Sequence, residues 1–372
     1  MKLLKKIISL LIITLTLIGI TGCDKMTDLG IPTSKRFPNG NVARCVWDLK
    51  VYNGNVYVGM GDYDSNTGPT DIWAYNLKKK KWENTATVKD ETISRFIEID
   101  GKLYAPGIDP MEDWKLGNYY LLENGKWETI RELPSAIHTF DIIKFENKLM
   151  FGVGARFDFP VLYTEDGENY NYIKFYKNYK NNEPYTWEGD DYTRGYEFLN
   201  FNNDLYVLTY HYHAKPKKAS ASLFKYNPTD NIFDYFSDGK SFYKFSTITS
   251  VNILNSKGSY KGKYFYVSDS LYYTEDMIEF TKAEVPNDAF ASQFKIYNEK
   301  MYILSYVKNE DGSYKTTIYS TPNGVSDYQE VYSFNFNVPP ISFDIYKNTA
   351  YIGMGDRFAV NEKNGTVLKI KI

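Results

Sequence analysis

Five of the seven arginines in this chain fall at the expected ends of short β-like segments: Arg44, Arg95, Arg156, Arg194 and Arg357. A guanidinium group binds a carboxylate or phosphate through two parallel hydrogen bonds, which the point charge of lysine does not match. Other ionisable side chains stand at equivalent places, namely His138, His211, Asp62 and Asp356. Together these residue types suit recognition of an acidic ligand, with carboxylates available as acids or bases.

Aromatic residues accompany these charges in two long excursions, residues 181–193 and 211–218. We expect both to wall the same site, with Tyr185, Trp187, Tyr210 and Tyr212 contributing. Aromatic faces beside Arg and Asp suit a sugar or an acidic glycan. The alternative is that the Arg and Asp residues pair with each other and simply join neighbouring parts of the fold.

A metal site would need more ligands than the sequence offers. His211 and His213 alternate as they would on one strand face, but the only other histidine, His138, lies in a different repeat. Zinc takes three or four protein ligands with second-shell support. We therefore expect no metal and no other cofactor.

The elements that must position these residues form a repeat. A polar turn followed by an apolar and then a Tyr, Phe or Met residue recurs seven times, with a mean separation of 49 residues. The copies are residues 53–57, 100–104, 146–150, 203–206, 261–265, 298–302 and 348–351. A period of this length is typical of repeat architectures.

Each unit contains four short β-like runs, which in the first unit are residues 46–52, 56–60, 71–75 and 81–85. The aromatic content of 17% and the absence of a long helical apolar period also favour strands. Four-stranded sheets repeated radially make a β-propeller. We predict an all-β, seven-bladed propeller of antiparallel blades, in which strand ends from all blades converge around one mouth of the central channel.

Ring closure follows from the two ends of the domain. The last unit supplies three strands, 341–346, 350–354 and 366–372, so we expect residues within 31–41 to add the missing outer strand. An open edge would otherwise template aggregation. This makes the first and last blades neighbours and places their similar segments, YVGMGDY (57–63) and YIGMGDR (351–357), on adjacent second strands.

Two families share short motifs with the chain. Residues 73–76 with 81–82, and 224–227 with 232–233, resemble Kelch repeats, although the Kelch double glycine is absent. The segment YTEDGENY (163–170) is similar to the Asp-box hairpin of sialidase-like propellers, and 273–276 is a weaker echo. Both resemblances imply a propeller, and Asp-boxes are turn-forming devices, so neither implies a catalytic residue. The Arg-Ile-Pro motif of sialidase domains is missing.

The N-terminus predicts export and anchoring. Basic residues precede a 14-residue apolar run, 7–20, that is too short to span a membrane comfortably. Ile20-Thr21-Gly22-Cys23 resembles a bacterial lipobox, which implies that Cys23 is lipidated after residues 1–22 are removed. We expect residues 23–41 to be a tether whose part can close the last blade, and 42–372 to be one propeller domain. The predicted location is the bacterial cell envelope, on either membrane.

The charge of the chain limits the classes of partner that we expect. A formal net charge of −2 gives no basic footprint for nucleic acid. The run Lys78 to Lys81 suggests anionic lipid or nucleic acid, or merely a solvated hairpin turn.

Three functions remain open. They are a membrane-tethered module that binds a glycan, peptide or protein at the channel mouth; a sialidase-like hydrolase or lyase that uses Arg44, Arg95 and Arg194 as a carboxylate grip with Asp62 or Asp356 as the acid; and an envelope assembly scaffold. Converging arginines with a nearby carboxylate would favour the hydrolase, whereas Arg–Asp pairs between blades would favour the scaffold.

Overall fold

The computed structural model describes residues 25–62, 65–112, 115–155, 159–185, 192–213, 218–238 and 256–372. These residues are almost entirely β-strands and turns. The helical turns are short 3-10 segments: η1 (Val42–Arg44), η2 (Tyr179–Asn181) and η4 (Pro286–Asp288). Within the described part of the chain, no helix has the length and hydrophobicity needed to cross a membrane.

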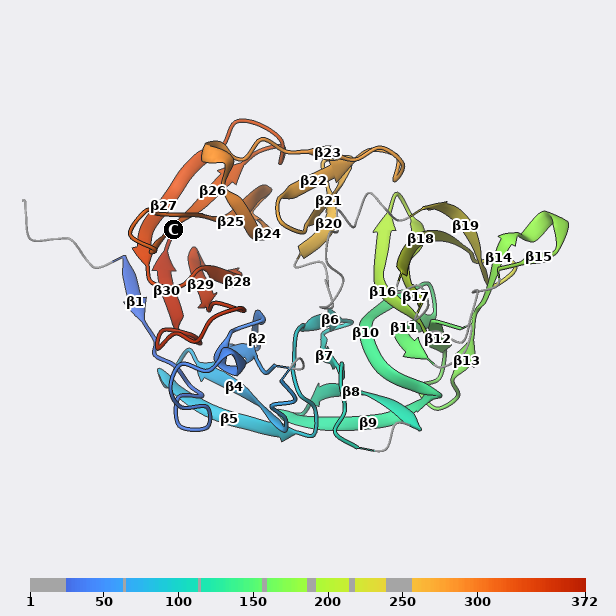
Figure 1. Cartoon of the computed structure of the whole chain (residues 1–372), viewed down its shortest axis with the longest axis horizontal. Helices are drawn as coiled ribbons and strands as arrows, with labels where there is room; N and C mark the ends of the chain where they lie inside the picture. The colour runs from blue at the N-terminus through green and yellow to red at the C-terminus, as the bar shows by residue number, and fades with distance from the viewer. Residues whose placement is uncertain are drawn as a thin grey trace, which may run out of the picture.

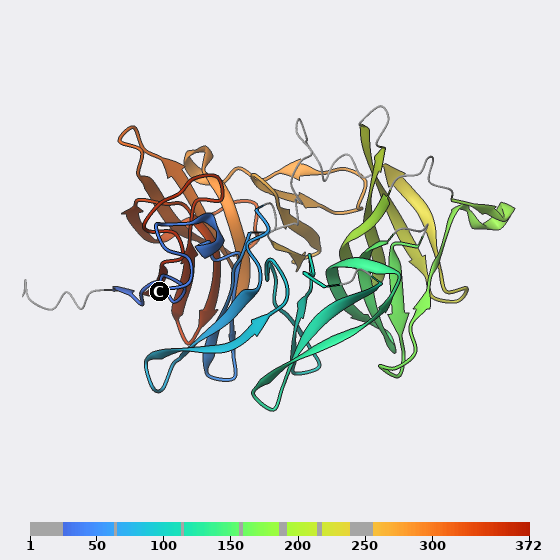
Figure 2. The same cartoon turned by 60° about the horizontal axis from the view of Figure 1, so that its bottom comes forward.

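The strands form antiparallel sheets arranged around a central axis, which is a propeller arrangement (Figure 1; Figure 2). Five of the sheets have four strands each, and consecutive strands pair in order. In sequence order from the inner strand, they are β2 (Asp48–Tyr52), β3 (Asn55–Gly59), β4 (Thr70–Asn76) and β5 (Lys81–Val88); β6 (Ile97–Ile99), β7 (Lys102–Pro106), β8 (Leu116–Glu123) and β9 (Lys126–Pro134); β20 (Ser256–Tyr260), β21 (Lys263–Val267), β22 (Leu271–Thr274) and β23 (Thr281–Lys282); β24 (Phe290–Tyr297), β25 (Lys300–Lys308), β26 (Tyr314–Thr321) and β27 (Gln329–Phe336); β28 (Pro340–Tyr346), β29 (Thr349–Met354) and β30 (Val367–Lys371) with β1 (Met26–Asp28).

A sixth sheet has ten strands. Its members are β10 (Ala136–Phe145), β11 (Lys148–Ala155), β12 (Val161–Thr164), β13 (Asn171–Tyr172), β14 (Lys174–Asn178), β15 (Glu183–Pro184), β16 (Tyr192–Phe201), β17 (Asp204–His213), β18 (Lys218–Asn227) and β19 (Ile232–Asp238). Two antiparallel runs, β10 to β13 and β16 to β19, are joined because β11 also pairs with β16, at Gly154 and Ala155.

The inner hairpins share one turn geometry. The first turn residue, which is Asn53, Asp100, Glu146, Asn202, Lys261, Asn298 or Lys347, has φ between 45° and 52°. Asn and Asp tolerate this left-handed region well, which explains why they fill most of these positions. The repeated turn found in the sequence is therefore a repeated backbone conformation.

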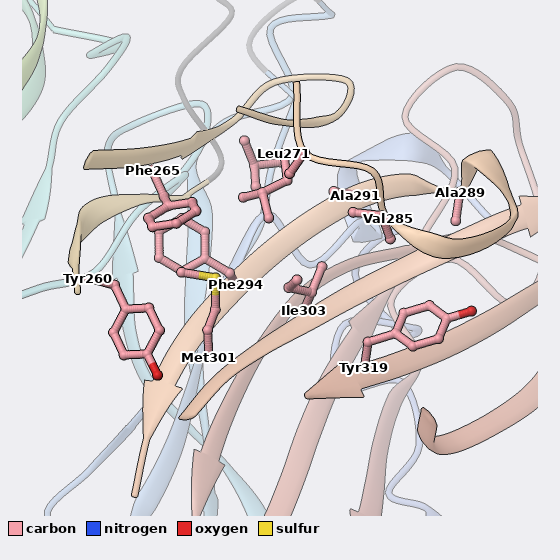
Figure 3. Packing of buried hydrophobic residues seen from close by; sticks show 12 residues of the cluster. Tyr260, Phe265, Leu271, Val285, Ala289, Ala291, Phe294, Met301, Ile303 and Tyr319 are labelled. Carbon is pink, nitrogen blue, oxygen red and sulfur yellow. The ribbon is translucent and has the colours of Figure 1, made fainter. Parts of the chain in front are cut away.

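The hydrophobic core consists of layers between neighbouring sheets. Figure 3 shows one such layer, where Phe265 of β21 and Leu271 of β22 face Phe294 of β24 and Ile303 of β25. All four side chains are buried. Each sheet buries its two apolar faces against the sheets on either side of it. Burial between neighbouring sheets around the ring therefore stabilises the fold.

The ring closes through the N-terminal strand. Strand β1 pairs antiparallel with β30, with Met26 opposite Ile370 and Asp28 opposite Leu368. Closure by the two ends is therefore confirmed, but the predicted residues were wrong, because the strand lies at 26–28 and not within 31–41. Of the residues that follow β1, Thr33 and Phe37 are buried. Part of the stretch expected as a tether is thus hydrogen-bonded along β30, from Lys25 to Leu29.

The similar glycine segments lie on second strands of adjacent sheets, as predicted. Strand β3 ends at Gly59 and β29 at Met354, and their inner partners β2 and β28 are in contact. A Cβ atom added at Gly61 would lie 2.1 Å from the Glu91 carbonyl oxygen, and one at Gly353 would lie 2.4 Å from Cγ1 of Val46. Glycine is required there because backbones and side chains of neighbouring segments approach too closely for any side chain.

The Asp-box resemblance is visible in the hydrogen bonds of the turn after β12. Asp166 Oδ1 accepts hydrogen bonds from the backbone N–H groups of Glu168 and Asn169, and Thr164 Oγ1 accepts one from Gly167. Thr274 and Asp276 repeat this pattern after β22. A third copy after β26 was missed in the sequence, because Asn323 takes the place of the Asp. All three are turns between third and fourth strands, so they shape hairpins.

Candidate functional site at the channel mouth

We define the mouth as the end of the ring where innermost strands begin and second strands end. The structure does not bring all of the predicted residues together there. Arg44 is buried against the N-terminal stretch, and Arg95 lies in a charge cluster inside the channel. Asp62, His138 and Arg194 lie near a group of acidic residues. Asp356 and Arg357 lie at a pocket on the rim. Cys23, Arg156 and Trp187 lie outside the described residues.

Arg44 holds the N-terminal stretch in place. Its guanidinium group donates hydrogen bonds to the carbonyl oxygens of Phe37 and, at 3.2 Å, Ser34, and the side chain is buried. Its Nη1 also lies 3.8 Å from Glu362. Arg44 therefore contacts the N-terminal stretch, contrary to the prediction that it lines the mouth.

Arg95 belongs to a charge cluster in the channel. It binds Glu197 in a two-point contact, with Nη1 2.9 Å from Oε2 and Nη2 2.8 Å from Oε1, and Nη1 lies 3.0 Å from Oδ1 of Asp141. Lys257 contacts both carboxylates as well. Burial alone would lower the pKa of Arg95, but the charges of Glu197 and Asp141 outweigh it and raise that pKa. These contacts connect β10, β16, β20 and the segment before β6.

The cluster is part of a wider pattern that sequence reasoning missed. One residue, five positions before the first turn residue of each inner hairpin, faces a neighbouring sheet or the channel; the set is Asp48, Arg95, Asp141, Glu197, Ser256, Gln293 and Ser342. Several bind the backbone of the next sheet. Oδ2 of Asp48 accepts from the Phe96 N–H at 2.7 Å, Oδ2 of Asp141 accepts from Phe198 at 2.8 Å, and Oε1 of Gln293 accepts from Phe343 at 2.9 Å. Aligning the repeats on their turns would have revealed this position.

Asp62, His138 and Arg194 lie beside the carboxylates of Asp90, Glu91 and Asp109, which form an acidic group near the mouth. His138 Nδ1 faces the Ile108 carbonyl oxygen and lies 3.7 Å from Oδ1 of Asp109. Burial and the charge of Arg194 lower the pKa of His138 to about 3, so the ring is neutral at pH 7. Arg194 stacks near Phe140 and its Nη1 donates to the Tyr196 hydroxyl at 2.9 Å.

Three further predicted residues, Tyr185, Tyr210 and His211, contact side chains of the ten-stranded sheet. His211 is buried and its Nδ1 lies 2.8 Å from Oγ1 of Thr193. Tyr210 is buried against Tyr196, with ring centroids 5.4 Å apart. Tyr185 stacks on Tyr235 at the outer edge of the ten-stranded sheet, where β14 and β15 project from the ring (Figure 1). The prediction that Tyr185 walls the mouth was therefore wrong, and residues 186–191 of the same excursion lie outside the described part of the chain. Among the described residues, no three His, Cys, Asp or Glu side chains form a group suited to a metal ion.

Asp356 and Arg357 lie on a pocket of about 570 Å³ at the mouth, between the sheets that begin with β20, β24 and β28. The Arg357 guanidinium lies over the Trp47 ring, 4.3 Å from its centroid. Trp47 itself is fixed, because its Nε1 donates to the Gly61 carbonyl oxygen at 2.7 Å. Asp356 Oδ1 accepts from the Phe358 N–H at 2.9 Å. A cation and a carboxylate are thus positioned at the same rim.

Aromatic side chains line the same pocket. Phe290 stacks on Tyr306 with ring centroids 5.5 Å apart, and Tyr314 meets Tyr306 edge to face at 5.7 Å. Phe290 is 52% exposed and Phe358 is 93% exposed. Lys308 adds a second cation over the Tyr314 ring. The sequence signal for Phe290 and Tyr306 was weak, because aromatic residues are common throughout this chain.

The acidic group near the mouth gives a pH-dependent prediction for Glu91→Gln. Burial, followed by the charges of Asp109 and Asp90, raises the pKa of Glu91 to about 7, compared with about 4.3 in an unfolded chain. The folded protein therefore holds this proton to higher pH, so the contribution of Glu91 to the free energy of unfolding is greatest below about pH 4 and declines up to about pH 7.

We expect Glu91→Gln to remove this decline. The measurement is urea unfolding of the native chain and the variant at several pH values between 4 and 8. The stability difference, variant minus native, should increase with pH. A difference that is constant across this range would contradict the assignment.

No protein-family model matches the chain, and no curated protein matches its sequence. Similar solved structures include Saccharomyces cerevisiae Sqt1, with 9% identity, a TM-score of 0.47, and coverage of 89% of this chain and 96% of that one. A chain of the Mitotic Checkpoint Complex has 8% identity, a TM-score of 0.49, and coverage of 94% and 95%. A putative 6-phosphogluconolactonase from Bacteroides fragilis NCTC 9343 has 10% identity, a TM-score of 0.44, and coverage of 87% and 97%.

Proposed function

We propose that this chain is a lipid-anchored, seven-bladed propeller of the bacterial cell envelope that binds a glycan in the rim pocket of Phe290, Tyr306 and Arg357. The pocket is the observation that carries the proposal, because it combines exposed aromatic faces with fixed charges at the mouth. Sugars stack their apolar C–H faces on aromatic rings, while polar groups fix their orientation.

The count of seven is supported by the ten-stranded sheet. We take its two antiparallel runs, β10 to β13 and β16 to β19, as two blades that touch through the β11–β16 pairing. The inner-hairpin turns and the polar position five residues before them also occur seven times. In this interpretation β14 and β15 are an outer addition to the blade that begins with β16.

The ligand is argued from the pocket's chemistry. Phe290 presents one ring face to Tyr306, which leaves much of the side chain exposed for stacking. Arg357 and Lys308 are placed to meet an acidic substituent, and Asp356 or Asp269 can accept hydrogen bonds from hydroxyl groups. Binding requires no more than this arrangement, so it is the function that we favour over catalysis.

The hydrolase alternative receives less support. It would use Arg44, Arg95 and Arg194 as one grip, yet Arg44 binds the N-terminal stretch and Arg95 binds Asp141 and Glu197 of other sheets. By the criterion given above, the pairing of Arg95 with Asp141 favours the scaffold over the hydrolase, whereas the rim pocket favours a binding module. A scaffold role would give the aromatic rim no ligand to bind. The glycan-array test below therefore distinguishes the scaffold from the binding module.

The test is a glycan array probed with the soluble fragment 24–372 and its Phe290→Ala variant. We expect a restricted set of glycans to bind, and Phe290→Ala to weaken their binding by about tenfold, because aromatic anchors contribute strongly to recognition. The matched control is Ile296→Ala, since Ile296 is 47% exposed near the other end of the same strand, β24. Equal binding by native chain and Phe290→Ala would contradict the site, and an empty array would contradict the ligand class.

A further inference from the structure

Exposed lysines gather where the chain enters its last sheet. Lys25 precedes β1, and its carbonyl oxygen accepts a hydrogen bond from the Lys371 N–H at 2.9 Å. The N–H of Ile372 then donates to the carbonyl oxygen of Asn348, at 3.0 Å, directly beside Lys347. Lys25, Lys347 and Lys371 are all exposed. They lie at the end of β30 that is opposite the mouth, because β30 starts at the mouth and runs away from it.

The neighbouring sheet adds the hairpin Lys78 to Lys81, which the proposed glycan site does not use. All four lysines are exposed, and their described ion pairs are those of Lys79 and Lys81 with Glu83, at 3.4 Å and 3.0 Å. The base of this hairpin packs on the segment after β1: Nε1 of Trp82 donates to the Leu29 carbonyl oxygen at 2.7 Å.

The same contact continues into the last sheet. Leu29, Leu77 and Trp82 pack in one hydrophobic cluster with Tyr351 of β29. The lysine hairpin and the entry point of the chain are therefore fixed to the same seam between two sheets. A charge run on a freely projecting turn would lack this connection.

We infer that this seam, formed by Lys25, Lys78 to Lys81, Lys347 and Lys371, is a docking surface for the anionic headgroups of membrane lipids. The inference rests on the proposed lipidation of Cys23. Only Asp24 separates Cys23 from Lys25, so the Cα atom of Cys23 lies within about 7 Å of the Cα atom of Lys25 even with the chain fully extended. Charges at this range act within one Debye length, about 8 Å at physiological salt.

Lipid anchoring therefore fixes the orientation of the disc. With so short a connection the membrane must contact the side of the ring where β1 begins, and the mouth at the other end of β30 faces away from the bilayer. Tyr346, which is exposed and carries the Lys347 ammonium over its ring at 5.0 Å, adds an aromatic group suited to the headgroup region. The glycan pocket would remain open to ligands outside the membrane.

The test uses fragment 23–372 carrying a single myristoyl-length chain coupled to Cys23. One such chain gives only marginal membrane binding, so an electrostatic contribution is measurable. Binding to phosphatidylcholine vesicles is compared with binding to vesicles containing about one-third phosphatidylglycerol. We expect at least about tenfold tighter binding to the anionic vesicles, lost at high salt, because each lysine near the surface adds to attraction.

The decisive variant replaces Lys78, Lys79, Lys80 and Lys81 with Gln and should bind anionic vesicles at least about fivefold more weakly than the unsubstituted conjugate. The matched control removes the same charge elsewhere, with Gln at Lys174, Lys180, Lys282 and Lys315, which are exposed on other sheets. Equal loss in both variants would show a general charge effect and overturn the docking surface. Lipidation is tested separately, by incorporation of labelled palmitate into the full chain and into Cys23→Ala.

Discussion

Replacing Glu197 with Ala is expected to lower the free energy of unfolding by about 3–5 kcal/mol, because it leaves two mostly buried cations with one carboxylate in place of two. Glu197 has a side-chain exposure of 0% and binds both Arg95 and Lys257. After the substitution these two cations would share Asp141 alone. The measurement is urea unfolding of fragment 24–372 and its variant, monitored by circular dichroism.

The matched control is Glu123→Ala. Glu123 pairs with Lys102 at 2.9 Å, but the two side chains are 39% and 48% exposed. A pair of this kind contributes at most about 1 kcal/mol. Glu197→Gln adds a second arm, because it keeps the shape and removes the charge. If Glu197→Ala cost no more than Glu123→Ala, the channel cluster would not be the fastening that we describe.

The fold was accessible from the sequence because its signals repeat. The turn at Asn53-Gly54 and its counterparts adopt a backbone conformation that few residue types favour. Those residue types therefore recur along the sequence with the period of the ring. Closure of the ring by its two ends could be predicted because the last unit of the sequence supplies only three strands. The position of the fourth strand did not follow, because a three-residue segment such as Met26–Asp28 carries no periodic pattern, and its assignment depends on pairing with β30.

The candidate site was only partly accessible. Sequence position places Arg95 before an innermost strand and Arg357 after a second strand, on the same side of the ring. Only packing decides that Arg95 meets Glu197 in the channel and that Arg357 lies over Trp47 at the rim. The partners come from distant repeats, so their spacing along the chain holds no information about the contact. Phe290 was missed for a similar reason: its exposure depends on the neighbouring sheets.

The second large effect is expected from removal of β1. Fragment 30–372 lacks the strand that covers β30, so it loses several backbone hydrogen bonds and the packing of Met26. At about 0.5–1.5 kcal/mol for each net hydrogen bond, the free energy of unfolding should fall by about 2–4 kcal/mol relative to fragment 24–372. The exposed edge should also promote self-association, detectable by size-exclusion chromatography.

A fragment that begins at Lys25 is the control for this deletion. It keeps every residue of β1 and should match fragment 24–372 in stability and in size. Deletion to residue 30 with no change in stability would mean that β1 adds nothing to the ring.

Closure of the ring by its two ends is the central claim, and disulfide formation between Thr27→Cys and Lys369→Cys in fragment 24–372 tests it most directly. These residues face each other across β1 and β30, and facing residues in antiparallel strands have Cα atoms about 4.5–5.5 Å apart, which suits a disulfide. Native Cys45 is buried and should not compete. The control pair is Thr27→Cys with Lys282→Cys, on the outer strand of a different sheet. We predict rapid, nearly complete cross-linking of the first pair under mild oxidation; cross-linking no faster than that of the control pair would contradict the closed ring.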